Sequence, residues 1–368
     1  MQIPIIQGNI FHELFVLEMA NNHLGNLDRG LRIISEFAQI ARFNNVRATI
    51  KLQFRDVDSF VHKDFRTRAD VRYIKKTLDT KLTKSDYAAL VDAVREQGCF
   101  TSATPFDEAS VDLCENLGID IIKLASSDIN DWFLIERIAK TRKPVSFSTG
   151  GSSMKDVDDL VKYFSSRGIP HAVNHCVSIY PSADHELELN QIDFLRTRYP
   201  LATIGFSTHE CRSWDASMLI SYAKGARTFE RHIDINADGV VVSPYCSQPK
   251  QIDAWFKAFK KAKEMCGGSG MERRFIPDKE VKYLDGLVRG VYAKRELPAG
   301  YVLHHSRMNE DLYLAIPLQK GQMSCREIMN GERLKRPLPK EQPLMIDHID
   351  SPYAEIDSLK EEIYSRGL

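Results

Sequence analysis

The stretch IIKLASSDINDWFLIERIAKTRKPVSFSTG, residues 121–150, contains one complete strand–helix–strand unit. Two short runs of mainly apolar and β-branched residues, 121–126 and 144–150, enclose a segment, 132–141, in which apolar residues recur at intervals of three and four. The first pattern predicts strands and the second an amphipathic helix. A strand, a helix and a further strand in this order predict two parallel strands joined by a right-handed crossover.

The same unit repeats on both sides of this stretch. Eight strand-like runs occur, at 15–20, 48–54, 99–105, 121–126, 144–150, 172–177, 203–209 and 228–234. Segments of helical period lie between them, among them 27–43, 84–98, 107–118, 132–141 and 213–225. Eight β/α units in roughly 250 residues predict an α/β fold of the closed (β/α)8 TIM barrel type. An open doubly wound sheet is the alternative that length and count alone leave.

Polar residues at the ends of the runs favour the barrel. Almost every run finishes in groups that an apolar core would reject, such as Glu18, Lys51, Thr104, Lys123, Ser148, His209 and Glu230. In a TIM barrel the C-terminal ends of all strands converge on one face, and active sites are built there. The barrel therefore predicts that these side chains share one site.

The pattern changes after a helical segment at 251–265. Residues 285–350 contain short strand-like runs and turns rich in glycine and proline, which predict a second, small domain. We therefore divide the chain into a barrel over 1–266, a linker over 267–284, the small domain over 285–350, and a tail over 351–368 with a short amphipathic helix.

The composition limits the partners of the protein. The 368 residues include 50 Lys plus Arg and 50 Asp plus Glu, so the formal net charge is zero. Without excess positive charge there is no general field to hold a nucleic acid or an anionic membrane. No run approaches the about 20 apolar residues of a membrane-spanning helix, and the first residues lack signal-peptide features. Seven scattered cysteines without a CxxC pair indicate reduced thiols. We expect a cytoplasmic protein.

Two histidines end neighbouring strands of the predicted barrel. Residues two apart on a strand point the same way, so His209 shares a face with Ser207. By the same rule His232 shares a face with Glu230, and Glu18 is adjacent across the closure of the barrel. Two imidazoles with oxygen groups nearby favour a divalent metal that acts as a Lewis acid. For either histidine alone, a half-buried structural residue is the alternative.

Two lysines, Lys51 and Lys123, lie within predicted strands. A buried lysine is unfavourable unless it meets an anion or donates to carbonyl groups, so an anionic substrate is the economical explanation. Ser126 and the turn STGG at 148–151 add hydroxyl and backbone N–H groups of the kind that bind phosphate. A plain strand-to-helix turn is the alternative for STGG. Together these groups predict a phosphorylated, carboxylated small molecule as substrate.

In this order, the motifs resemble those of the sialic acid synthase family. The matching elements are EMANNHLG (18–25), KLQF (51–54), ATPFD (103–107), the stretch 123–150, HCVSIYPS (175–182), GFSTHE (205–210) and GARTFERHIDI (225–235). Residues 285–350, which open with RGVYAKRELPAGYVL, resemble the antifreeze-like (SAF) domain that follows the barrel in this family. The resemblance implies a nonulosonic acid synthase, which condenses phosphoenolpyruvate with an N-acylated hexosamine-type aldose and releases phosphate by C–O cleavage.

The resemblance also implies roles for individual residues. It implies that His209 and His232 are metal ligands. The metal is usually manganese, with magnesium or cobalt as alternatives. It implies catalytic roles for four charged residues, namely Glu18, Glu230, Lys51 and Lys123. Phosphoenolpyruvate would be bound by Lys51, Lys123, Thr104, Ser126, Ser148 and Tyr180, and the sugar by Glu18, Glu230, Gln53 and Phe106. A domain-swapped homodimer is implied, in which the small domain supplies Arg289 to the acceptor.

Several departures from the family pattern lie near the acceptor. Thr208 stands where the family usually has Asp, Ser178 stands where Asn is common, and Arg231 replaces Lys. The stretch 236–249 lacks a Gly-Pro-Asp-His element, whose aspartate typically contacts the acceptor hydroxyls. We therefore expect an acceptor other than plain N-acetylmannosamine, such as a modified bacterial sugar.

Other functional classes fit parts of the pattern. A Schiff-base aldolase would use Lys123, would survive EDTA, and would be trapped by borohydride with pyruvate. A hydrolytic metalloenzyme would need more ligands than the sequence places. A non-catalytic sugar-binding relative fits the small domain but leaves the lysines on the barrel strands unexplained. Metal dependence separates the aldolase from the synthase.

Overall fold

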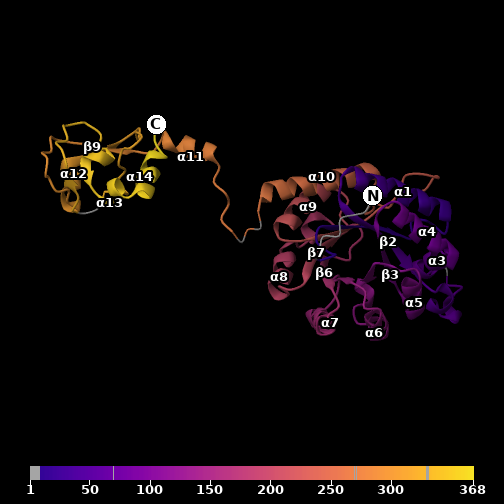
Figure 1. The fold of residues 1–368 in the computed structure, drawn as a ribbon. Coiled ribbons are helices and arrows are strands. Elements are labelled where there is room, and N and C mark those ends of the chain that lie inside the picture. Colours follow the sequence, from indigo (N-terminus) through magenta and orange to yellow (C-terminus); the bar gives the residue numbers. More distant parts are fainter. Residues whose placement is uncertain (1–8, 69, 269, 271, 329–330) are drawn as a thin grey trace. The chain divides into compact units, whose positions relative to one another are not determined.

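The computed structural model describes residues 9–368 except 69, 269, 271 and 329–330. The chain divides into two compact units, Met1–Gly267 and Gly268–Leu368 (Figure 1). Each unit buries an apolar core of its own. The two units are therefore described one after the other.

The N-terminal unit is a closed barrel of eight parallel strands (Figure 1). Strands that follow one another in the sequence are neighbours in the barrel, and the first pairs with the last to close it. The strands are β1 (Leu14–Ala20), β2 (Arg47–Phe54), β3 (Phe100–Pro105), β4 (Ile121–Leu124), β5 (Val145–Ser148), β6 (His171–Cys176), β7 (Thr203–Thr208) and β8 (Thr228–His232). The predicted TIM barrel is confirmed, and the open sheet is excluded.

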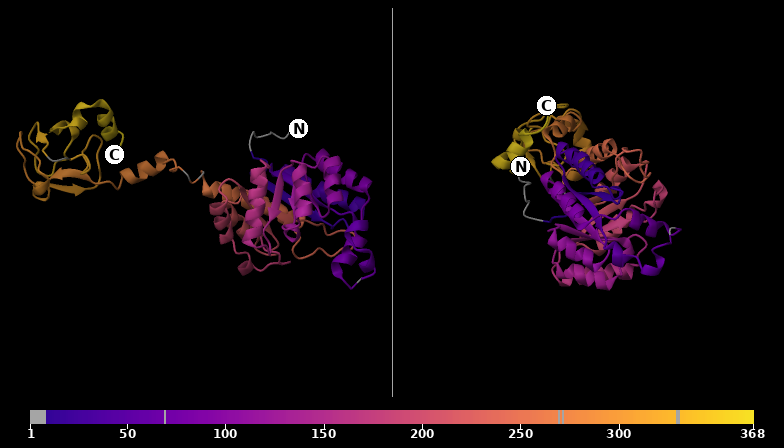
Figure 2. Two further views of the ribbon diagram at one scale, coloured as in Figure 1. Left: turned by 90° about the horizontal axis from the view of Figure 1, so that it is seen from below. Right: turned by 90° about the vertical axis from the view of Figure 1, so that its right-hand side faces the viewer.

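Helices connect the strands and cover the outside of the barrel (Figure 2). The main ones are α1 (Leu27–Phe43), α4 (Lys84–Glu96), α5 (Glu108–Asn116), α6 (Trp132–Lys140), α7 (Met154–Ser166), α8 (Asn190–Arg198), α9 (Trp214–Ala223) and α10 (Pro249–Cys266). Shorter elements are α2 (Val57–Phe60), η1 (Lys63–Phe65), α3 (Arg72–Asp79), η2 (Ser126–Asp128) and η3 (Asp184–Glu186). Across the described residues, no helix combines the length and apolar character needed to cross a bilayer.

Several helices begin at side chains that cap them. Asn26 caps α1 and Asp107 caps α5, each by accepting a hydrogen bond from a backbone N–H of the first turn. Thr83 and Asp86 form a reciprocal capping box at the start of α4. Such a cap contributes about 1 kcal/mol, because it satisfies N–H groups that the helix leaves unpaired. These caps fix where the βα connections end.

Aromatic packing holds the closure of the barrel. The Phe15 ring on β1 meets the rings of Phe229 on β8 and of Trp255, Phe256 and Phe259 on α10, with centroids 4.8 to 5.4 Å apart. All five side chains are buried. Aromatic pairs in this range add about 1 kcal/mol each beyond the area they bury. The last helix is thereby anchored over the seam between the first and last strands.

Gly205 on β7 allows three strands to approach closely. A Cβ at this position would lie 1.9 Å from Thr228 Oγ1 on β8 and 2.2 Å from Asn174 Oδ1 on β6. Thr228 Oγ1 donates a hydrogen bond to Asn174 Oδ1 at 2.8 Å. The space is therefore occupied by this hydrogen bond, and only glycine fits.

The C-terminal unit contains short strands and helices. They are α11 (Asp278–Asp285), β9 (Gly290–Ala293), η4 (His305–Arg307), α12 (Met308–Asp311), β10 (Leu312–Ala315), β11 (Arg333–Leu334), η5 (Ile346–His348), β12 (Ile349–Asp350), α13 (Pro352–Glu355) and α14 (Asp357–Tyr364). β9 pairs antiparallel with β10, and β11 with β12. The stretch 267–284, expected as a linker, contains most of α11. Within the expected tail, Ile363 of α14 is buried in the core of this unit.

Candidate active site

Four charged side chains from four strands meet inside the barrel. Lys51 Nζ lies 2.5 Å from Glu18 Oε2 and 2.7 Å from Glu230 Oε1. Lys123 Nζ lies 3.1 Å from the other oxygen of Glu230. All four side chains are buried. Glu230 therefore links the two lysines, and we call Glu18, Lys51, Lys123 and Glu230 the inner cluster.

The two carboxylates of the inner cluster have different proton affinities. Burial, helped by the like charge of Glu230, raises the pKa of Glu18 against the attraction of Lys51. Burial acts in the same direction on Glu230, but Lys123 and Lys51 outweigh it and hold the pKa of Glu230 well below its usual range. Paired carboxyl groups with separated pKa values take different roles in acid–base chemistry. The lysines thus favour the ionised form of Glu230, whereas burial favours the protonated form of Glu18.

The two lysines also differ. Burial lowers the pKa of Lys123. For Lys51 burial is outweighed by the two carboxylates that it contacts, and the pKa of Lys51 is raised. Lys51 is thus a permanent cation, while Lys123 is held charged mainly by Glu230.

The Lys123 ammonium group contacts the Ser148 hydroxyl, and the Ser126 and Ser178 hydroxyls lie against the backbone of residues 148–150. Lys123 Nζ donates to Ser148 Oγ, and Ser126 Oγ donates to the Ser148 carbonyl at 3.4 Å. A Cβ on Gly150 would lie 2.1 Å from Ser178 Oγ, so Ser178 lies against the backbone of the STGG turn. An ammonium group with hydroxyls and a glycine turn around it is suited to a phosphate group.

His209 and His232 lie side by side at the ends of β7 and β8. Their ring centroids are 5.4 Å apart, and the ring planes are inclined by 44°. His209 Nδ1 is hydrogen-bonded to the Val177 carbonyl at 2.9 Å, which leaves Nε2 available. His232 Nδ1 is buried and has no hydrogen-bond partner among the described residues. Burial lowers the pKa of His209 to about 4 and that of His232 well below its ordinary value, so both rings are neutral at pH 7.

This pair fits a divalent metal ion. The neutral imidazole is the form that coordinates metals. Because metal–nitrogen bonds are about 2.1 Å long, two rings whose centroids are 5.4 Å apart are close enough to share one ion. Among the residues that the structure describes, no group of three or more His, Cys, Asp or Glu is arranged to hold a metal. The protein would therefore supply two nitrogens and leave open positions, as catalytic rather than structural sites do.

Three further predicted residues lie near this site. The Tyr180 ring centroid is 3.8 Å from that of His209, and a contact of Tyr180 with phosphoenolpyruvate stays a prediction. Gln53 Oε1 accepts a hydrogen bond from Arg55 at 3.1 Å. The Arg55 guanidinium carbon in turn lies 3.7 Å from the centroid of the Phe106 ring.

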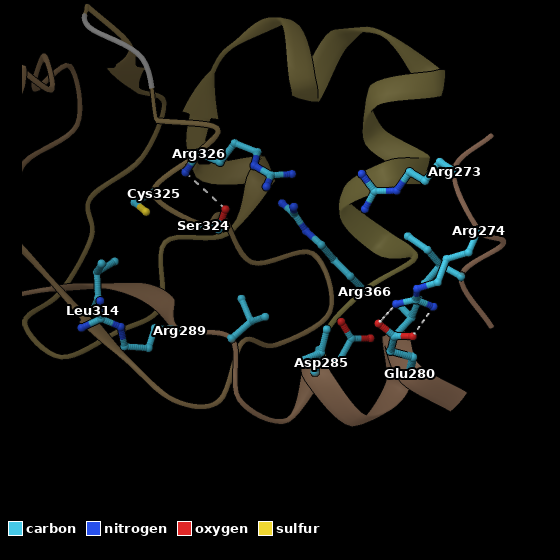
Figure 3. Close-up of a pocket in the computed structure, with 14 residues that line it drawn as sticks. Arg273, Arg274, Glu280, Asp285, Arg289, Leu314, Ser324, Cys325, Arg326 and Arg366 are labelled. Carbon is cyan, nitrogen blue, oxygen red and sulfur yellow. Dashed lines mark hydrogen bonds and ion pairs between the residues drawn. The ribbon is translucent and has the colours of Figure 1, made fainter. Parts of the chain in front are cut away.

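Thr104 and Arg289 complete the predicted set. Thr104 is the register partner of Gln53, and its buried Oγ1 has no hydrogen-bond partner in the part of the chain that is described. Arg289 lies in the C-terminal unit just before β9, where it lines a cavity of about 560 Å³ (Figure 3). Further arginines line the same cavity, namely Arg273, Arg274, Arg326 and Arg366. A contact of Arg289 with an acceptor stays a prediction.

Three residues for which no site role was predicted also contact the site. Ser207 Oγ donates to Glu230 Oε1 at 3.3 Å, and it was noted only as sharing a face with His209. Ser178 was noted only as a departure from the family pattern. Arg55, which touches Gln53 and Phe106, follows β2 directly, and a cation just after a barrel strand was the available signal.

Two departures from the family pattern face away from the inner cluster. Thr208 Oγ1 donates to the Glu210 carboxylate, and Arg231 Nη1 lies 3.0 Å from Glu210 Oε1. The Arg231 guanidinium also lies 5.9 Å from the ring centroid of Trp214 on the outer helix α9. Both side chains therefore bind Glu210 rather than a member of the inner cluster.

The chain is similar in sequence to named synthases. The family model described as the NeuB family matches residues 43–271. The N-acetylneuraminate-9-phosphate synthase of Drosophila melanogaster is 26% identical over 336 residues, which cover 86% of each chain. The N,N'-diacetyllegionaminic acid synthase of Campylobacter jejuni is 24% identical over 80% of this chain and 89% of that protein.

Solved structures agree with these similarities. A Chromobacterium violaceum protein described as spore coat polysaccharide biosynthesis protein E is 35% identical, with a TM-score of 0.87 over 92% of this chain and 99% of that chain. The N-acetylneuraminic acid synthetase of Leptospira borgpetersenii is 23% identical and shares the fold, with a TM-score of 0.65 over 78% of this chain and 96% of that chain. The family model covers more than half of this sequence. The chain therefore belongs to the NeuB family, the family of the sialic acid synthases.

Proposed function

We propose that this protein condenses phosphoenolpyruvate with an N-acylated hexosamine-type aldose to form a nonulosonic acid, and releases phosphate by C–O cleavage. The inner cluster carries the proposal, because it lies between the histidine pair, which would bind a metal, and the hydroxyls that would bind phosphate. At one end of the cluster, Glu18 is the register partner of His232. At the other end, Lys123 contacts Ser148. Relatives named as N-acetylneuraminate-9-phosphate, legionaminic and pseudaminic acid synthases support the class of reaction.

Phosphoenolpyruvate binds at the Lys123 end in this proposal. The Lys123 ammonium group and the hydroxyls of Ser126 and Ser148 hold the phosphate. Negative charge builds up on the phosphate as the C2–O bond breaks, and a fixed ammonium group in a dry site stabilises this charge more than water does. Ionised Glu230 holds Lys123 in place, and Lys51 pairs with the other oxygen of the same carboxylate.

The aldehyde of the sugar lies at the histidine end. His209 and His232 would hold a divalent ion, for which we propose manganese, and such an ion would supply Lewis-acid polarisation of the aldehyde oxygen. C3 of phosphoenolpyruvate then forms the new bond to the aldehyde carbon and leaves a cation at C2, which ionised Glu230 stabilises. Water adds to C2 and gives a proton to Glu18, which passes a proton to the alkoxide that forms from the aldehyde oxygen. The tetrahedral species at C2 then expels phosphate, and the new C2 hydroxyl gives its proton to the departing phosphate as it becomes the ketone carbonyl.

We further propose that the acceptor is not plain N-acetylmannosamine. The stretch 236–249 lacks the acceptor-binding element expected of the family. The start of this loop is instead held by ion pairs with an arginine of the barrel. Arg29 on α1 lies 2.6 Å from Asp234 and 3.2 Å from Asp238. Turnover of N-acetylmannosamine should be lower than that of dideoxy diacetamido hexoses, and comparable turnover would contradict the acceptor proposal.

A homodimer belongs to the same proposal, with Arg289 of the partner subunit contacting the acceptor. Mixing two inactive variants, Arg289→Ala and Lys123→Met, tests it. If each active site needs groups from two subunits, mixed dimers regain activity because one of their two sites is intact. No recovery after subunit exchange would count against the shared site.

The main test is phosphate release from phosphoenolpyruvate with manganese and a panel of hexosamines. We expect release that requires a sugar, stops with EDTA and returns with manganese. Because burial lowers the pKa of Lys123, a Schiff-base aldolase is the specific rival. Borohydride trapping of pyruvate on Lys123 in the presence of EDTA would favour that rival and contradict the synthase.

A further inference from the structure

A second buried ion pair lies on the outer side of β7 and β8. Glu210 directly follows His209, and Arg231 directly precedes His232. Arg231 Nη1 lies 3.0 Å from Glu210 Oε1, and each side chain is only 1% exposed. We propose that Glu210 and Arg231 are positioning residues that set the separation of the two imidazoles. This inference rests on the proposed metal role of His209 and His232, but it adds residues that have no part in the chemistry described above.

The hydrogen-bonded ladder between β7 and β8 ends before the histidines. Thr208 and Arg231 are the last register partners of the two strands. Beyond them, the Arg231 guanidinium donates to the backbone carbonyl of Glu210 while its Nη1 pairs with the carboxylate of the same residue. One planar group thus holds both the main chain and the side chain of the residue next to His209.

The same guanidinium also reaches the segment next to His232. Arg231 Nε donates to Ser247 Oγ, and the Ser247 N–H donates to the His232 carbonyl at 2.8 Å. Arg231 is therefore connected to the backbone beside both histidines. Arginine suits this task because its donors lie in one rigid plane, whereas the lysine ammonium is a single point charge on a flexible chain.

Both carboxylate oxygens of Glu210 accept hydrogen bonds from other side chains of the protein. Its Oε2 accepts from Thr208 Oγ1, and its Oε1 accepts from Ser217 Oγ on α9 as well as pairing with Arg231. On the other side, the Ser182 N–H donates to the His209 carbonyl at 3.2 Å. The His209–Glu210 segment is thus held from two directions. Because the carboxylate faces α9, it acts through position and not by contact with a substrate.

Stability alone does not account for this pair. Removing two charges from water carries a large penalty, and apolar side chains of similar volume in place of a buried ion pair are often neutral or stabilising. An apolar pair would fill the same space, but it would make no directed bond to the Glu210 carbonyl or to Ser247. What the ion pair provides is a fixed geometry of the two backbones.

The test uses the double variant Glu210→Leu/Arg231→Met, which exchanges the pair for apolar side chains. Manganese affinity is measured with the metal alone, by the electron paramagnetic resonance signal of free Mn²⁺, and thermal melting is recorded in parallel. We expect melting close to that of the wild type and a dissociation constant raised at least about tenfold, since groups that orient metal ligands typically contribute 10- to 100-fold. Wild-type affinity in the folded double variant would overturn the proposal.

Two controls keep the result decisive. The variant Asp158→Leu/Arg198→Met removes an ion pair between α7 and the end of α8, away from β7 and β8, and should leave manganese affinity unchanged. If the double variant does not fold, Glu210→Gln/Arg231→Gln takes its place, because it keeps polar side chains but removes both charges and the three-way contact of the guanidinium. An affinity equal to the wild type in this variant would then overturn the proposal.

A metal-free readout separates this inference from the proposed function. Crystal structures of the wild type and the double variant, both without metal, give the ring separation directly. We expect the His209 ring to move by about 1 Å or more, a displacement of the size that disables active sites. If the wild type binds no manganese, the metal part of the proposed function fails, and the ring positions still decide whether the pair is a positioning device. Unchanged ring positions would overturn it.

Discussion

The inner and outer sides of β7 and β8 carry similar chemical groups to different ends. On the inner side, Glu230 contacts two lysines and His232 has a buried ring nitrogen without a hydrogen-bond partner among the described residues. On the outer side, Arg231 and Glu210 form an ion pair, and the Glu210 carboxylate accepts hydrogen bonds from two hydroxyls. Because strand residues alternate in direction, one short run of sequence builds both clusters. The inner side thus gathers the charged groups of the candidate active site, whereas on the outer side the charged groups bind the backbone and side chains of the barrel wall.

Breaking the inner cluster should have the largest effect. Glu230→Gln keeps the shape of the side chain but leaves Lys51 to Glu18 alone and removes the carboxylate that holds Lys123. We expect kcat to fall by about 10²–10³-fold, because an electrostatic contact to the developing charge is lost. Phosphate release at saturating substrate measures this, and a loss below tenfold would argue against a catalytic role for Glu230.

Breaking the Glu210–Arg231 pair on one side only should also lower the stability of the protein. Arg231→Met leaves Glu210 buried without its cation, which is expected to lower the free energy of unfolding by about 3–5 kcal/mol. Adding Glu210→Leu should recover most of this loss, because no charge then remains buried. Urea unfolding of the single and double variants checks the difference. Equal stabilities of the two would show that the charges are not coupled.

His23, which follows β1, makes the stability of the barrel depend on pH. Burial, with a smaller contribution from Lys76, lowers the pKa of His23 to about 4, and its Nδ1 accepts the Gly25 N–H at 3.0 Å. The unfolded chain binds a proton near pH 6.5 and the folded chain only near pH 4. Stability is therefore expected to fall as the pH drops through this range, by up to about 3 kcal/mol in total.

The variant His23→Gln isolates this contribution. Its free energy of unfolding should depend less steeply on pH between 6.5 and 4 than that of the wild type, although the other buried histidines still contribute in the same direction. Urea unfolding at a series of pH values gives both slopes. Identical slopes would mean that His23 is not the group responsible.

The smallest effect is expected for the hydroxyl of Ser217, which donates to Glu210. Ser217→Ala removes one donor to Glu210 but leaves Arg231 in place. A lost hydrogen bond of this kind lowers the free energy of unfolding by about 1 kcal/mol. Manganese affinity should stay within about twofold of the wild type, as measured by the free Mn²⁺ signal, if Arg231 alone positions the backbone.

Much of the fold was predictable because periodicity reports burial. The helix predicted at 27–43 has these bounds in the structure, and all eight predicted strands are present. The short helices α2 and α3 between β2 and α4 were missed, because one or two turns show too little period to recognise. The helix α11 was missed within the expected linker, although an acidic first turn after Pro277 is typical of a helix start.

The convergence of the charged side chains was predictable, but their pairing was not. Convergence of strand ends brings Lys51, Lys123 and Glu230 together, whereas the level of each side chain in the barrel decides that Glu230 bridges both lysines. Tyr180 lies in a connection after β6, and strand periodicity says nothing about where such a residue lies. No role was predicted for Glu210, because the sequence next to His209 does not indicate whether this side chain points into the barrel or toward the outer helices.

The close contact at Gly205 has a consequence for how this sequence can change over time. Any larger residue would force β6 and β8 apart at Asn174 and Thr228, and β8 carries half of the imidazole pair. Position 205 should thus resist drift even where the neighbouring Ile204 and Phe206 accept other apolar residues. In a library that samples every residue of β7, survivors selected for activity should retain glycine here almost without exception.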